Sequence, residues 1–190
     1  MQGNPSFLAR VLLYLILERW CSNMISFSKK ISDIFDIYTP KKKQQIYKIY
    51  TASEISNYII NKCCSENKSI SNLQLQKILY FLQRKFLQEK GYPLFSDEIE
   101  AWDFGPVVRK IYFKFCGFGA SPLFELSNDN VDFNTKDKQI IDSLVEIYRD
   151  KNPWELVEES HAKGKAWDMI YNYGIGNKKI IPKELIATYG

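Results

Sequence analysis

The chain has 190 residues, of which 45% are hydrophobic and 15% aromatic, a composition that suits a globular domain with a well-filled core and excludes disorder over the whole length. The net charge of +4 is uneven: of 26 basic and 22 acidic residues, eight and three fall in residues 1–50, which leaves 18 and 19 for residues 51–190. Because nucleic-acid binding needs clustered basic charge, the nearly neutral second part shows no strong signal for that class.

The first 50 residues are predicted to form a basic N-terminal extension. Its apolar run, Phe7–Trp20, has an uninterrupted core of seven residues, Val11–Leu17, whereas roughly 20 are needed to span a bilayer. No small-residue cleavage site follows, so we expect a short amphipathic or core helix rather than a membrane or signal segment. The lysines at 41–43 are expected to be solvated. Met24 is an alternative start, which leaves open whether residues 1–23 are native.

A mainly helical domain is predicted for residues 51–190. Thr51 with Glu54, and Ser71 with Gln74, form capping boxes in which the paired side chains satisfy free N–H groups at a helix start. Apolar residues at helical spacing follow both boxes. Gly91 is expected to end the second helix in a left-handed conformation.

A short strand and a further helix are expected after the turn at Tyr92–Pro93. Residues 98–103 alternate in side-chain character, which is typical of a strand. Gly105–Pro106 is expected to open the next helix, because proline is favoured at the first helical position. The glycines on either side of Phe118 are expected to end that helix, since no Gly-Lys-Ser/Thr follows them to make a phosphate loop.

Short elements are expected in the rest of the chain. Thr135 and Asn152 are predicted to cap helices, the second with Pro153 in its first turn, and Pro182 is predicted to open a last short helix. Ile180–Ile181 is expected to pair as an edge strand. The predicted fold is therefore a compact multi-helix domain with at most a small two- to three-stranded β element.

The four cysteines show no spacing typical of a metal site. Cys63 and Cys64 are adjacent, and neighbouring side chains on a helix point in different directions. Since the chain has one histidine, a zinc site of the usual composition is hard to assemble. We expect reduced thiols, a cytoplasmic location, and no metal or other cofactor.

His161 is the strongest candidate for catalysis. With Glu158 or Glu159 nearby it would act as a general base. No Ser or Cys motif marks a nucleophile for it to activate, and the alternative is a hydrogen-bonded residue at a helix end. We favour the second interpretation.

Two other groups of residues leave alternatives open. The acidic residues between Asp97 and Asp103 would hold a divalent metal only if they shared one face, and alternation along a strand separates them. Trp102, Trp154 and Trp167 suit either a core or the centre of an interface.

Several segments in this order resemble the SocA-like, Panacea-domain family, also known after the prophage-associated protein GepA. They are LQLQKILYFLQ (Leu73–Gln83), PLFSDEIEAWDFGPVVRKIY (Pro93–Tyr112), NPWELVEESH (Asn152–His161) and Trp167. The most specific part is E-A-W-x-x-G-P-V, and the resemblance covers about Thr51 to Tyr189. The positions that it marks as family-motif or possible partner-binding residues are Gln76, Lys77, Tyr80, Trp102, Gly105, Pro106, Trp154, His161 and Trp167.

The resemblance implies a compact, mainly α-helical domain found in phage, prophage and bacterial genomes. Many members resemble antitoxins that neutralise unrelated toxins by direct contact, some act beside proteolysis machinery, and none has established catalytic residues. It thus implies a non-enzymatic antitoxin for a toxin encoded by an adjacent gene. The alternative is a phage accessory protein that acts as adaptor or inhibitor of a host defence or proteolytic component. An enzyme that uses His161 is the third hypothesis, and no oligomeric state is indicated.

Overall fold

The computed structural model describes residues 47–124 and 131–190, and the chain divides between Ile46 and Tyr47. The predictions for the run Phe7–Trp20, for lysines 41–43 and for the start of the chain lie outside the described residues. A domain boundary at residue 50 stays a prediction.

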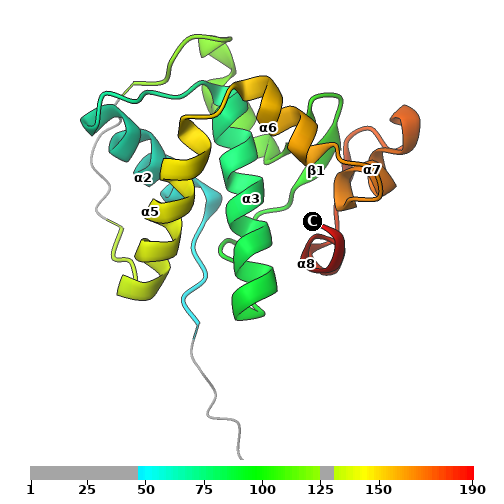
Figure 1. Cartoon of the computed structure of the whole chain (residues 1–190), viewed down its shortest axis with the longest axis horizontal. Helices are drawn as coiled ribbons and strands as arrows, with labels where there is room; N and C mark the ends of the chain where they lie inside the picture. The colour runs from blue at the N-terminus through cyan, green and yellow to red at the C-terminus, as the bar shows by residue number, and fades with distance from the viewer. Residues whose placement is uncertain (1–46, 125–130) are drawn as a thin grey trace, which may run out of the picture. The chain divides into compact units, whose positions relative to one another are not determined.

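The described part is mainly α-helical with one small sheet, as predicted (Figure 1). Its seven α-helices are α2 (Ala52–Ser65), α3 (Asn72–Lys90), α4 (Arg109–Phe115), α5 (Thr135–Arg149), α6 (Pro153–Ser160), α7 (Ala166–Tyr171) and α8 (Lys183–Tyr189). Two short 3-10 helices are η1 (Cys116–Phe118) and η2 (Asn172–Gly174). None of these helices is long and apolar enough to cross a membrane.

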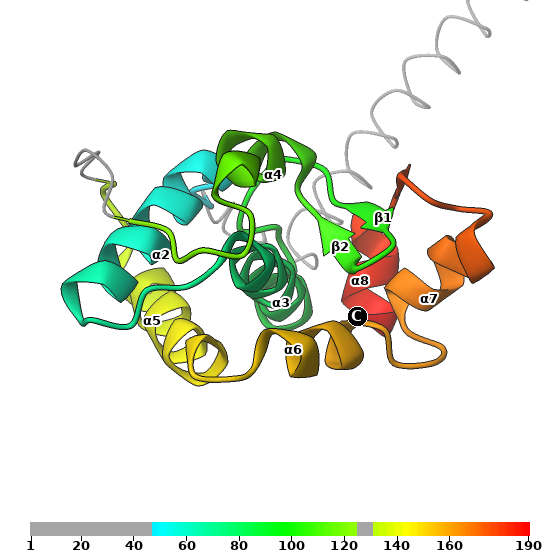
Figure 2. The same ribbon diagram turned by 90° about the horizontal axis from the view of Figure 1, so that it is seen from above.

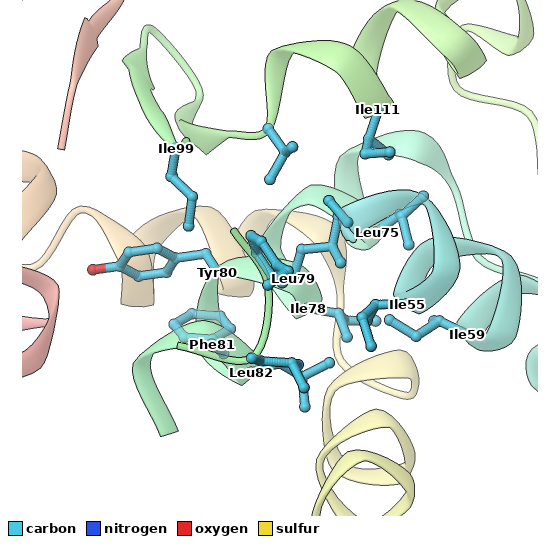
Figure 3. Packing of buried hydrophobic residues seen from close by; sticks show 14 of the residues in the cluster. Ile55, Ile59, Leu75, Ile78, Leu79, Tyr80, Phe81, Leu82, Ile99 and Ile111 are labelled. Carbon is cyan, nitrogen blue, oxygen red and sulfur yellow. The ribbon is translucent and has the colours of Figure 1, made fainter. Parts of the chain in front are cut away.

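Helix α3 is the centre of this domain. Figure 2 shows it end-on, with α2, α4, the sheet, α8, α6 and α5 arranged around it. A helix enclosed in this way buries side chains on several faces. The apolar stripe that helical spacing predicts for α3 is 0% exposed: Leu75, Ile78, Leu79, Leu82 and Phe86. Figure 3 shows Leu75, Ile78 and Leu82 of that stripe beside Ile55 and Ile59 of α2. Each such aliphatic side chain contributes about 1.5–3 kcal/mol to folding when buried.

Both predicted capping boxes are confirmed. The Thr51 hydroxyl accepts a hydrogen bond from the Glu54 N–H, and the Glu54 carboxylate accepts one from the Thr51 N–H at 2.7 Å. Ser71 and Gln74 make the same reciprocal pair at the start of α3. Gly91 ends α3 with a φ of 73°. These helix ends agree with local sequence because the groups that satisfy them lie within one turn.

The sheet corrects one prediction. Strand β1 (Glu100–Trp102) lies between β2 (Gly105–Val107) and β3 (Lys179–Ile180), and both pairings are antiparallel. Gly105 and Pro106 therefore begin a strand, and the prediction that they open a helix is wrong. The φ of Gly105, 100°, suits a hairpin turn and not a helix. Pro106 is tolerated because β2 is an edge strand, where a missing N–H is acceptable.

Of two further predicted helix caps, one is displaced by a residue and one is confirmed. Asn134, and not Thr135, is the N-cap of α5: its side chain accepts from the Lys136 N–H at 2.9 Å. Asn152 caps α6 by accepting from the Trp154 N–H, with a proline in the first turn as predicted.

Candidate functional site

A buried lysine connects α3 to the hairpin of β1 and β2. Lys77 is 0% exposed, and its Nζ donates a hydrogen bond to the Pro106 carbonyl at 3.2 Å. Burial lowers the pKa of Lys77 to about 7, because an ammonium loses its hydration when it is enclosed in protein. Lys77 therefore contacts the interior of the domain and not its surface.

Gly105 is required at its position for two independent reasons. Its φ of 100° is in a region that side-chain-bearing residues rarely adopt. In addition, a Cβ there would lie 2.5 Å from Lys77 Nζ and 2.8 Å from Ser160 Oγ. The absence of a side chain at Gly105 thus allows β2, α3 and α6 to pack together.

Gln76 joins α3 to the start of α4. Its side chain is 1% exposed; its Oε1 accepts from the Val108 N–H at 2.9 Å, and its Nε2 donates to Asn72 Oδ1 at 3.1 Å. The Asn72 amide in turn donates to the Tyr112 carbonyl at 3.2 Å. These buried amide groups are hydrogen-bonded to one another and to the backbone, so their burial does not leave unpaired polar groups.

An aromatic stack joins α6 to α7. The ring of His161, the C-cap residue of α6, lies parallel to Trp167 with centroids 3.6 Å apart, and Trp167 stacks on Tyr171 at 4.5 Å. Trp167 also donates from Nε1 to the Trp102 carbonyl at 2.9 Å. These contacts fix the hairpin, the end of α6 and α7 to one another.

The surroundings of His161 do not assemble a general base. Burial, and then the nearby charge of Lys77, lower the pKa of His161 to about 4, so its imidazole is neutral at pH 7. The carboxylate of Glu159 accepts from Tyr148 and Lys151 instead of orienting the imidazole. His161 Nε2 is buried and has no hydrogen-bond partner among the described residues.

Most of the nine family-motif positions belong to this buried frame. Tyr80 is 1% exposed, and burial raises the pKa of its hydroxyl to about 12. Gln76, Lys77, Gly105, Pro106 and Trp167 are also buried, whereas His161 and Trp102 are partly exposed. Trp154 is 57% exposed, so the three tryptophans divide between core and surface.

A hollow of about 560 Å³ opens where α3, the hairpin, α4 and α6 meet. Its apolar lining includes Leu73, Trp102, Phe104, Tyr112 and Trp154. The rings of Phe104 and Trp154 meet edge to face at 5.8 Å, and those of Trp102 and Tyr112 lie 4.9 Å apart. Phe104, 59% exposed, is absent from the residues predicted from sequence. The sequence feature that could have identified Phe104 is an aromatic residue in the two-residue turn of a hairpin.

The acidic residues around β1 have separate structural partners. Asp97 accepts from the Ala52 N–H at 2.7 Å, Glu100 from Trp102 Nε1 at 2.8 Å, and Asp103 from the Tyr171 hydroxyl at 2.9 Å. Within residues 47–124 and 131–190, no group of His, Cys, Asp and Glu could hold a metal ion. The metal alternative for the residues between Asp97 and Asp103 is therefore not supported.

Comparison with known proteins gives two matches and one absence. A family model described as "Antitoxin SocA-like, Panacea domain" matches residues 75–168, a range that contains all nine motif positions. Antitoxin SocA of Caulobacter vibrioides (strain NA1000 / CB15N) is 33% identical over 132 residues, which cover 64% of this chain and 70% of that protein. No solved structure matches the chain.

Proposed function

Because the chain belongs to the SocA-like antitoxin, Panacea-domain family, we propose that it is a non-catalytic, cytoplasmic antitoxin that binds a toxin protein and neutralises it by direct contact. Its partner is the toxin encoded by an adjacent gene. Family membership carries this proposal.

The arrangement of polar and apolar groups supports binding over catalysis. The amine of Lys77 and the hydroxyl of Ser160 are 0% and 1% exposed, so a substrate has no direct approach to these two groups. By contrast, Phe104 and Trp154 leave more than half of their surface exposed. Aromatic residues of this kind are enriched where proteins contact each other.

Co-expression tests the proposal. The product of the adjacent gene, produced alone from an inducible promoter, is expected to arrest growth, and the full chain produced with it is expected to restore growth. The two proteins are also expected to co-purify at a fixed ratio. Growth arrest that persists despite normal amounts of the folded chain, together with no complex, would refute the proposal.

A substitution at His161 separates binding from catalysis. His161→Phe keeps a flat ring against Trp167 but removes every proton-transfer atom of the imidazole. We expect the folded variant to restore growth as well as the wild type does. If it folds and binds the toxin but no longer neutralises it, the imidazole is needed for more than binding, and the proposal of simple sequestration is wrong.

A further inference from the structure

We propose that the hollow lined by Trp102, Phe104 and Trp154 is the toxin-binding surface, and that it receives a toxin segment with a large apolar side chain beside a carboxylate. This inference rests on the proposed function and assigns it a place and a chemistry. Throughout, "the aromatic hollow" means the cavity whose apolar lining includes Leu73, Trp102, Phe104, Tyr112 and Trp154.

The size of the aromatic hollow suits side chains of a protein segment. Its volume of about 560 Å³ is within the range of about 300–1,000 Å³ typical of binding pockets. Phe104 and Trp154 are 59% and 57% exposed, so their outer faces extend the contact beyond the cavity. A partner that covers both rings removes their remaining apolar surface from water, which is the main favourable contribution to association.

The two buried amide side chains beneath the hollow already have partners. Gln76 and Asn72, which line it, are bonded to each other and to the backbone at Val108 and Tyr112. A polar ligand would have to compete with these internal hydrogen bonds. The hollow therefore favours an apolar side chain over a sugar, a nucleotide or another ligand that needs several hydrogen bonds.

The charge of Lys178 at the hollow indicates which charge the partner carries there. Lys178 lines it, and Lys178 Nζ lies 5.6 Å from the centroid of the Trp102 ring. Among the described residues, no carboxylate forms a salt bridge with Lys178, whereas Asp103, the acidic residue of the lining, already accepts a hydrogen bond from Tyr171. A carboxylate on the partner complements the ammonium and adds electrostatic attraction to the apolar contact.

The first experiment measures the affinity of the purified full chain for the adjacent-gene toxin. Phe104→Ala and Trp154→Ala are each expected to raise the dissociation constant about tenfold or more, because truncation of an aromatic hot-spot residue typically weakens binding by this much. Lys178→Glu is expected to raise the dissociation constant about fivefold. The effect should be smaller at high salt, because salt screens charge pairs.

Matched controls lie elsewhere on the domain. Tyr189→Ala removes an aromatic ring that is 46% exposed on α8, and Lys136→Glu reverses a charge on the first turn of α5; neither residue lines the aromatic hollow. Both are expected to bind within about twofold of the wild type. Thermal unfolding confirms that each variant is folded.

The second experiment identifies the occupant directly. Phe104 is replaced by photoreactive p-benzoyl-phenylalanine, and the crosslinked toxin peptide is identified by mass spectrometry. We expect a peptide with a large apolar residue next to Asp or Glu, and no crosslink from the same group at position 189. A peptide without acidic residues would overturn the proposed chemistry.

The outcomes separate the inference from the proposed function. If the wild type does not bind the toxin, the proposed function fails and the inference fails with it. If the wild type binds but the folded Phe104→Ala and Trp154→Ala variants bind equally well, only the inference fails. If these substitutions instead dissociate a dimer of the chain alone, the occupant is a second copy and the inference is overturned.

Discussion

Lys77 is buried with one hydrogen bond, to a carbonyl, and burial is what shifts its pKa. Such a group destabilises the folded state whenever it is charged, because the ammonium loses hydration that the Pro106 carbonyl only partly replaces. Its position is nevertheless useful: the long side chain spans the gap that Gly105 leaves between α3 and β2. A favourable packing role and an unfavourable charge thus belong to the same residue.

The pH dependence of stability tests this account of Lys77. Its folded pKa of about 7 lies below the ordinary value of 10.5, so between these values the unfolded chain binds more protons and the free energy of unfolding rises with pH. From pH 7 to pH 9 we expect Lys77 to contribute a rise of about 2 kcal/mol. Urea unfolding at both pH values gives the change in the free energy of unfolding for the wild type and for Lys77→Met. The difference between these two changes is the contribution of Lys77.

Two other groups with shifted pKa values leave the comparison of wild type and Lys77→Met interpretable. His161, with a pKa lowered to about 4, changes stability below pH 7. Burial raises the pKa of Cys63 from 9.0 to about 11, which lowers stability from about pH 8 upward as the unfolded thiol ionises. Because Lys77→Met keeps this thiol, its contribution cancels in the comparison with the wild type. Lys163→Met, at an exposed lysine, is the control and should leave the wild-type slope unchanged. An identical slope in wild type and Lys77→Met would contradict the account.

At the scale of elements, the β1–β2 hairpin is the part that most depends on one residue. Three antiparallel residue pairs join the strands, too few to be stable alone in water. The hairpin is instead held by contacts with its neighbours, including the bond from Trp167 Nε1 to the Trp102 carbonyl. It presents Phe104 at its turn, so its position also sets one wall of the aromatic hollow.

Gly105→Ala should disrupt this hairpin. The new Cβ would meet Lys77 and Ser160 and would force a residue with a side chain to a φ of 100°. We expect a loss of about 3 kcal/mol in the free energy of unfolding, measured with urea. Gly119→Ala is the matched control, because Gly119 also has a positive φ but its Cβ would meet nothing within 4 Å. Equal losses at both glycines would show that space at Gly105 does not matter.

At the scale of the whole molecule, the domain begins before its first helix. Tyr50 is 2% exposed, its N–H donates to the Leu94 carbonyl at 2.9 Å, and its carbonyl accepts from the Ser96 N–H at 3.2 Å. Its hydroxyl also accepts from the Asn134 N–H at 3.1 Å. Tyr50 thus packs into the core of the described domain, one residue before the boundary that the sequence predicts at Thr51.

Two shortened chains test this boundary. A chain of residues 47–190 is expected to unfold at the same temperature as the full chain, within about 2 °C. A chain of residues 52–190 loses buried Tyr50 and the Thr51 cap, and we expect it to be less stable by about 3 kcal/mol. Equal stability of the two shortened chains would place the boundary after Thr51, and instability of both would show that the first 46 residues are needed for folding.

Much of the helical architecture is predictable because it depends on neighbours in the sequence. The boxes at Thr51 and Ser71 and the left-handed Gly91 act within one turn, and the apolar stripe of α3 repeats at the helical period. Gly105–Pro106 is different, since the same two residues suit a helix start or an edge strand. Pairing of Pro106 with Ala101 decides between them.

The sequence by itself determined the mainly helical class, the main helix starts and the family, because caps, periodicity and motif order are local or ordered along the chain. Only the tertiary structure decided which motif residues face inward and which face outward. Lys77 and Gly105 became an internal contact, whereas Trp154 and Phe104 came together at an exposed hollow. The physical reason is that burial depends on which distant segments pack against a residue, and here those segments come from α3, the hairpin and α6.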